Sequence, residues 1–120
     1  MINLAKRQGR GSVALAQIAK EEKISLKYLE RLFAGLKKAG LVKAEIGAGG
    51  GYKLANSASK INIYDIIKAL EGKLSAFHCT GKKEKVYCNV KCDCAVTYVL
   101  TRVEQAITKT MKDIKLNQLL

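Results

Sequence analysis

Several common features are missing from this sequence of 120 residues. Proline and tryptophan are absent and no segment is repeated or of low complexity, which excludes proline-rich linkers and repeat arrays. No paired carboxylates, Ser-His-Asp set or phosphate-binding loop can be recognised, so we expect no enzyme. No apolar run reaches the roughly 18 to 20 residues of a membrane-spanning helix, and no signal peptide opens the chain. We therefore expect a cytoplasmic protein with no membrane partner.

Positive charge is the most prominent feature that is present. Lys and Arg number 22 against 10 acidic residues, which gives a net charge of +12 and favours polyanions such as nucleic acid or an anionic membrane surface. The first 56 residues hold 11 of the basic and four of the acidic side chains. We therefore expect the first half of the chain to bind the polyanion, within a globular protein that has one hydrophobic core.

Two helices are predicted in this basic half. Helical spacing of apolar residues over residues 14–22 indicates the first helix, and Ser25 is a suitable N-cap for the second. The apolar stripe of the second helix is formed by Leu26, Leu29, Leu32, Phe33 and Leu36. Its other faces carry Lys27, Tyr28, Glu30, Arg31, Lys37 and Lys38. Two helices joined by a short turn, with a basic outer face, are typical of a helix-turn-helix.

A glycine-rich hairpin follows these helices. Val42, Ala44 and Ile46 alternate with polar residues, and an extended pattern resumes at Tyr52 after a tip that contains four glycines between residues 47 and 51. Such a tip allows the backbone to approach a ligand closely, as a wing on DNA requires, although an ordinary flexible hairpin has the same pattern.

Two more helices are predicted in the second half. Residues 63–71 form a short core helix that begins after Asn62 and ends at Gly72. Residues 95–114 space apolar side chains along one face for about five turns, which is more than a small domain covers by itself. We interpret this long helix as the contact of a homodimer, with packing inside the chain as the alternative. The expected fold is mainly α with a small β-hairpin wing and a C-terminal dimerisation helix.

All four cysteines and the histidine lie in one segment between these helices. Eight, three and one residue separate Cys79, Cys88, Cys92 and Cys94, and no C-x-x-C pair of the zinc-binding kind occurs. Thiolates are soft ligands that suit iron-sulfur clusters, and nearby lysines favour the thiolate form. The alternatives are zinc binding and a redox sensor based on direct thiol oxidation. Cys92 or His78 is a candidate fourth ligand beside three cysteines.

In this order of helix, glycine wing, cysteine segment and long helix, the sequence resembles the Rrf-type winged helix-turn-helix transcriptional regulators, the family of IscR, NsrR and CymR. The resemblance implies a homodimer that binds double-stranded DNA, with a [2Fe-2S] or [4Fe-4S] cluster held by Cys79, Cys88 and Cys94. It places Ser25, Lys27, Tyr28 and Glu30 on the recognition helix. It assigns the wing contacts with DNA to Gly49, Gly50, Gly51 and Tyr52.

Three positions depart from the family pattern. Met1 falls where the longer first helix of the family is half complete, Ile46 replaces an arginine that commonly enters the minor groove, and Thr97 replaces a histidine ligand of some members. The resulting division is a DNA-binding domain over residues 1–72, a sensor segment over 73–94 and a dimerisation helix with its tail over 95–120. A basic RNA-binding protein or a redox thiol protein is the alternative class.

Overall fold

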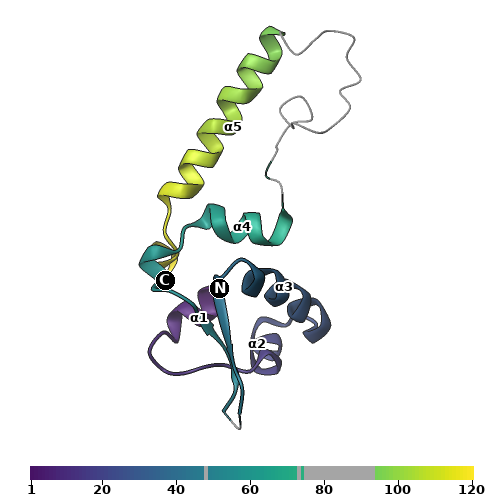
Figure 1. Cartoon of the computed structure of the whole chain (residues 1–120), viewed down its shortest axis with the longest axis vertical. Helices are drawn as coiled ribbons and strands as arrows, with labels where there is room; N and C mark the ends of the chain where they lie inside the picture. Colours follow the sequence, from purple (N-terminus) through teal and green to yellow (C-terminus); the bar gives the residue numbers. More distant parts are fainter. Residues whose placement is uncertain (48, 73, 75–93) are drawn as a thin grey trace.

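The computed structural model describes residues 1–47, 49–72, 74 and 94–120. Figure 1 shows a base formed by the first four helices and a hairpin, from which one long helix extends. This mainly helical structure with a two-stranded wing confirms the expected fold class. In chain order the elements are α1 (Ile2–Lys6), α2 (Leu15–Glu22), α3 (Leu26–Lys38), β1 (Val42–Glu45), β2 (Gly51–Leu54), η1 (Ala58–Lys60), α4 (Ile63–Glu71), α5 (Ala95–Asp113) and η3 (Leu116–Leu119).

Side-chain caps fix the starts of two helices where the sequence predicted them. The Ser25 hydroxyl accepts the backbone N–H of Tyr28 at 3.2 Å at the start of α3. The Asn62 side chain likewise accepts the N–H of Asp65 at 2.8 Å at the start of α4. Each bond satisfies a backbone donor that has no partner inside the helix, and such a cap is worth about 1 kcal/mol.

The hydrophobic core lies between α3, the hairpin and the helices around them. Helix α3 contributes Leu29, Phe33 and Leu36, which are all nearly inaccessible. Leu26, predicted in the same stripe, is instead 41% exposed because it is the first residue of the helix. The full set of buried residues is Leu4, Ala5, Val13, Ile18, Ala19, Leu29, Phe33, Leu36, Leu41, Val42, Leu54, Ala58, Ile61, Ile66 and Leu116.

The tail after α5 returns to this core. Leu116 is 1% exposed and belongs to the same apolar cluster as residues of α1 and α3. Its backbone N–H donates to the Ile61 carbonyl at 2.8 Å, and the Ile63 N–H donates to the Ile114 carbonyl at 3.0 Å. The two ends of the chain therefore lie side by side, with η3 against α1 (Figure 1).

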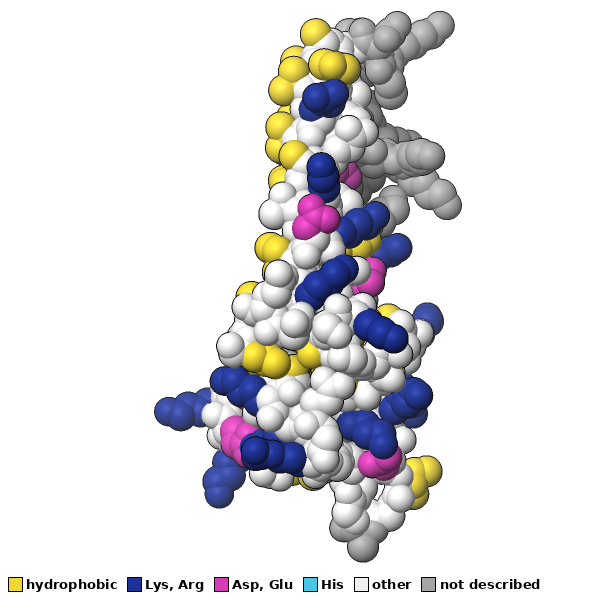
Figure 2. Space-filling model, turned by 90° about the vertical axis from the view of Figure 1, so that its left-hand side faces the viewer, with side chains coloured by type: hydrophobic (Ala, Val, Ile, Leu, Met, Phe, Trp, Pro, Cys, Tyr) yellow, Lys and Arg dark blue, Asp and Glu magenta, His cyan; other side chains and the backbone are white. Residues whose placement is uncertain are grey.

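Helix α5 differs from the other long helix because none of its residues is buried. Figure 2 shows apolar side chains gathered along one edge of the upper part of the molecule. The large exposed apolar residues of α5 are Val96, Tyr98, Val99, Val103 and Ile107. None of the described helices combines the length and apolarity needed to cross a membrane.

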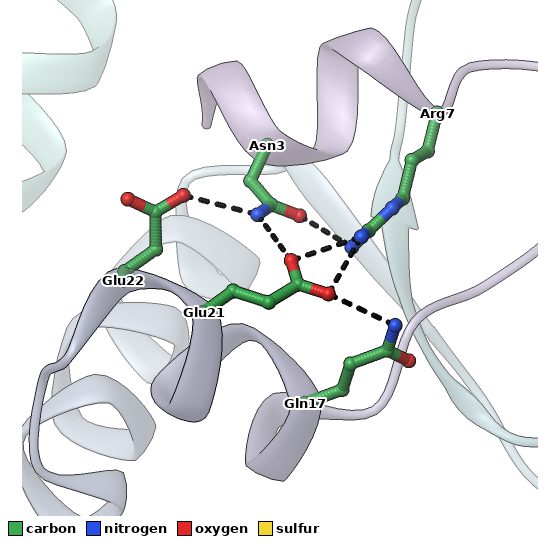
Figure 3. Close-up of polar contacts among 5 residues, drawn as sticks. All are labelled: Asn3, Arg7, Gln17, Glu21 and Glu22. Atoms are coloured by element: carbon green, nitrogen blue, oxygen red, sulfur yellow. Dashed lines mark hydrogen bonds and ion pairs between the residues drawn. The ribbon is translucent and has the colours of Figure 1, made fainter.

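A polar cluster joins α1 to α2 (Figure 3). The Arg7 guanidinium donates to both carboxylate oxygens of Glu21, at 2.7 and 2.9 Å, and to the Asn3 side-chain oxygen at 2.7 Å. The Asn3 amide donates to Glu21 and Glu22 at 2.9 and 3.0 Å, and the Gln17 amide donates to Glu21 at 3.0 Å. Glu21 is thus the common acceptor of three side chains.

These donors change the acidity of Glu21. Hydrogen bonds from Arg7, and then from Asn3 and Gln17, lower the pKa of Glu21 to about 2 from its ordinary value of 4.5. Because the folded-state pKa is lowered, the ionised Glu21 stabilises the fold above about pH 4.5, and this contribution is lost as the pH falls toward 2.

We predict that Glu21→Gln removes part of the acid sensitivity of the protein. The wild type should lose stability between pH 4.5 and 2, and the variant should lose less across the same window because it has no carboxyl group to protonate there. Urea unfolding followed by circular dichroism at a series of pH values measures this difference. Glu71→Gln, on α4 and outside the cluster, is the matched control. An unchanged pH dependence in Glu21→Gln would contradict the prediction.

Candidate nucleic-acid interface

The residues that α3 exposes to solvent are determined by the residues that it buries. Since Leu29, Phe33 and Leu36 point into the core, residues at the intervening positions face solvent. Lys27 and Arg31 are one turn apart and share a face. All residues of α3 and its N-cap that the sequence assigned to DNA are exposed, namely Ser25, Lys27, Tyr28, Glu30, Arg31, Lys37 and Lys38.

The cations of α3 have no acidic partner in the part of the chain that the structure describes. The two ion pairs within this part are Arg7 with Glu21, between α1 and α2, and Lys53 with Glu45, on the hairpin. The guanidinium of Arg31 lies 5.3 Å from the centre of the Tyr28 ring, which is 47% exposed. Helix α3 therefore presents uncompensated positive charge beside an exposed aromatic ring, a combination suited to phosphates and base edges.

The wing is an antiparallel hairpin in which Val42 pairs with Leu54 and Glu45 pairs with Gly51. The described residues of its tip are Ile46, Gly47, Gly49 and Gly50. Gly49 is exposed, as a backbone contact with DNA would require. At Gly50 a Cβ atom would lie 2.6 Å from the Glu45 carbonyl oxygen, so the turn itself excludes a side chain.

Two residues assigned to the wing contact also hold the wing in place. A Cβ atom on Gly51 would lie 2.3 Å from the carbonyl group of Val13, so this close approach requires glycine. The Tyr52 ring packs edge-to-face on Phe33, with ring centres 4.9 Å apart and planes at 75°. Gly51 thus connects the wing to the loop before α2, and Tyr52 connects it to α3. Contacts of these two residues with DNA stay a prediction.

The connection between α1 and α2 reaches the wing, and sequence reasoning missed this contact. The Ser12 hydroxyl donates to the Gly49 carbonyl at 2.8 Å. Val13 and Tyr52 exchange two backbone hydrogen bonds, of 3.0 and 2.8 Å. The only local signal is the run of small residues around Arg10 before Val13, which gives no indication of a partner far along the chain.

The candidate metal ligands lie mostly outside the described residues. This applies to His78, Cys79, Cys88 and Cys92. Cys94 is described: it is the N-cap of α5, half-buried, with a free thiol. Within residues 1–47, 49–72, 74 and 94–120, no group of three or more potential metal ligands comes together.

Comparisons with known proteins agree with this geometry. A family model described as Rrf2, iron-dependent transcriptional regulator, matches residues 1–120. A solved structure of CymR, the global cysteine regulator of B. subtilis, superimposes with a TM-score of 0.79 and 34% identity, covering 98% of this chain and 84% of that one. IscR from T. potens gives a TM-score of 0.77 and 37% identity, covering 98% and 75%.

Curated relatives carry the same kind of name. IscR of Cereibacter sphaeroides, named an HTH-type transcriptional regulator, is 48% identical over 75 residues, which are 62% of this chain and 48% of that protein. The chain spans about half the length of such relatives. These relatives are named as regulators and not as enzymes, in agreement with the expectation from the sequence. The match over the whole chain confirms the resemblance found in the sequence, and the protein belongs to the Rrf2 family of transcriptional regulators.

Proposed function

We propose that the chain is a cytoplasmic, homodimeric transcriptional regulator that binds duplex DNA through α3 and the wing and holds an iron-sulfur cluster in its cysteine segment. The observation that carries the DNA-binding part is the set of exposed cations on α3 without acidic partners among the described residues. A helix about 10 to 12 Å wide fits the major groove of B-DNA, which is about 12 Å wide. The wing then lies beside α3, in the position fixed by Tyr52 and Phe33.

Within this interface the side chains of α3 divide into two kinds of contact. Lysines such as Lys27 and Lys38 provide point charges for phosphates, which give affinity without reading sequence. Arg31 and Tyr28 form a partly preordered pair, because the guanidinium already lies over the ring within cation–π distance. This pair is suited to base edges, so it is the candidate for sequence discrimination.

We predict that Lys27→Ala weakens binding to DNA and makes it less sensitive to salt. Loss of one phosphate contact should lower the slope of log K against log salt by about 0.9. The measurement is fluorescence anisotropy with a mixed-sequence duplex of about 30 base pairs, between about 50 and 200 mM salt. Lys109→Ala, which removes an exposed lysine from α5, is the control.

The same titration separates DNA binding from RNA binding. A-form RNA has a deep, narrow major groove that a helix cannot enter. An RNA duplex of equal length should therefore bind the protein more weakly than DNA does. Equal binding of both duplexes, with the same slope for wild type and Lys27→Ala, would reject the assignment of α3 as the recognition helix.

The dimer is proposed from the apolar face of α5. Val96, Val99, Val103 and Ile107 recur at helical spacing, and each is 40% or more exposed. Helix α5 has 19 residues and is about 28 Å long, and these four residues span about 17 Å of it. Such a face is costly to leave in water, and the same face of a second copy covers it with two-fold symmetry. A two-fold dimer also presents two α3 helices to successive half-sites on DNA.

We predict that Val103→Lys converts the protein from dimer to monomer, because the charge would be buried without a partner in the middle of the contact. Sedimentation velocity at micromolar concentration distinguishes the two states. Gln105→Lys places the same charge on the opposite side of α5 and should leave the dimer intact. A wild-type protein that sediments as a monomer would exclude the proposed dimer.

The cluster is proposed from the chemistry of the ligand set. The family model is described as iron-dependent, and Cys94 offers a half-buried, free thiol at the N-terminus of α5. The positive end of a helix dipole favours an anionic ligand there, which is the form that a thiolate ligand takes. We assign Cys79, Cys88 and Cys94 as ligands, with Cys92 or His78 as the fourth. A bound cluster would provide a redox-sensitive centre.

Helix α4 is the proposed connection between the cysteine segment and DNA. It precedes this segment in the chain and packs on α3 so closely that a Cβ atom on Gly35 would lie 3.0 Å from the Ala69 carbonyl oxygen. It also contacts α5, since the Lys112 ammonium lies 4.9 Å from the centre of the Tyr64 ring. A change at the cysteines alters DNA affinity only if it favours one of two arrangements of these helices.

We predict that the protein purified without oxygen absorbs between about 300 and 600 nm, with iron and sulfide in matching amounts. Cys88→Ala should abolish these bands, because removal of a thiolate ligand destabilises the cluster. Asn89→Ala, a change in the same segment, should retain them. A protein that stays colourless after reconstitution would favour the cluster-free alternative, a regulator of the same fold switched by thiol oxidation or a protein partner.

A further inference from the structure

The tip of the wing lacks a free cation of its own. Ile46, at the end of β1, is fully exposed at 104% and carries no charge, and glycines occupy the other described positions of the tip. Lys53, on β2, forms an ion pair with Glu45 across the hairpin. The hydrogen bond from Lys53 lowers the pKa of Glu45, and the resulting carboxylate offsets the charge of Lys53. The tip itself therefore offers no charge to a phosphate backbone, although Lys43, farther back on β1, is exposed.

The α1–α2 connection is the segment bonded to the tip. The Ser12 hydroxyl donates to the Gly49 carbonyl at 2.8 Å, and Val13 forms an isolated antiparallel bridge with Tyr52. Figure 1 shows the connection crossing the hairpin on its way to α2. Because Gly51 has no side chain, the two backbones approach more closely there than any other residue would allow. The connection and the wing therefore form one continuous surface.

Arg10 is the cation that this connection carries. It is exposed, and among the described residues its side chain has no acidic partner, whereas nearby Arg7 is fully engaged by Glu21. Gly9 and Gly11 flank it with φ angles of 89° and 93°, a region that other residues rarely adopt. These glycines set the shape of the turn and place no side chain beside the guanidinium, which is left free to reach an external anion.

We infer that Arg10 is a phosphate-binding residue of the DNA interface and supplies the charge that the wing tip lacks. Its guanidinium contacts a backbone phosphate of the strand along which the wing lies, and the bond from Ser12 to Gly49 holds the connection and the tip in register. The inference rests on the proposed function, because it requires that the chain binds duplex DNA. It adds a contact from a segment outside both the recognition helix and the wing.

The test uses the full chain and the mixed-sequence duplex described above. Arg10→Gln should weaken binding by about tenfold and lower the salt slope by about 0.9, because one charged phosphate contact is lost. Arg10→Lys should retain the slope, since a phosphate contact needs the charge more than the fork geometry. Lys109→Gln removes a charge from α5 and should change neither quantity. Unfolding by urea should be the same for all these variants, because the side chains are exposed.

Ser12→Ala tests the positioning of this segment. It should weaken binding while leaving the salt slope unchanged, because the change removes no charge but takes away the hydroxyl that is bonded to Gly49 and that also lowers the pKa of Glu45. Ser12→Thr keeps the hydroxyl and should restore the affinity. A loss of slope in Ser12→Ala would contradict the role given to this hydrogen bond.

The outcomes separate this inference from the function on which it rests. If the wild type shows no salt-dependent binding to the duplex, the proposed function is wrong. A second outcome would reject the role of Arg10 alone. In that outcome the wild type and Arg10→Gln bind with equal affinity and equal salt slope, while Lys27→Ala binds more weakly and with a lower slope. The protein would then bind DNA without a contact from Arg10.

Discussion

The packing of Phe33 against Tyr52 is the interaction on which the proposed DNA-binding surface depends. Phe33 is 2% exposed in the middle of α3, and Tyr52 lies on β2, so their edge-to-face contact joins α3 to the wing. Such an aromatic pair adds about 0.5 to 1.5 kcal/mol to the effect of burial. Its larger consequence is geometric, because it holds together the two elements that we propose to contact DNA.

The pattern of paired and unpaired charges shapes this surface further. Acidic residues neutralise Arg7 beside α2 and Lys53 on the hairpin. The described cations of α3 are left without such partners, as is Arg10 on the connection. A net charge of +12 would attract any polyanion, and the two ion pairs among the described residues neutralise cations only beside α2 and on the hairpin, so the outer face of α3 keeps all of its positive charge. The proposed binding surface is therefore distinguished by cations that share one exposed helix face, and not by the total charge.

Local patterns in the sequence predicted local structure well. The caps at Ser25 and Asn62 and the hairpin depend on residues only a few positions apart. The bond from Ser12 to Gly49 and the burial of Leu116 join segments 37 or more positions apart, and no short-range periodicity encodes them. The same limit applies to the candidate site: exposure of the α3 cations followed from helical spacing, whereas the contribution of the α1–α2 connection required the folded chain.

The burial of Leu116 has a mechanical consequence for α5. Because the tail is bonded to Ile61 and Leu116 is held in the core, the C-terminal end of α5 is fixed to the base, while Cys94 lies at its opposite end. A helix of 19 residues is about 28 Å long, so a displacement of about 5 Å at Cys94 corresponds to a tilt of about 10° at the base. A movement at the cysteine end would therefore reach the base only as a small rotation of α5, next to its contact with α4.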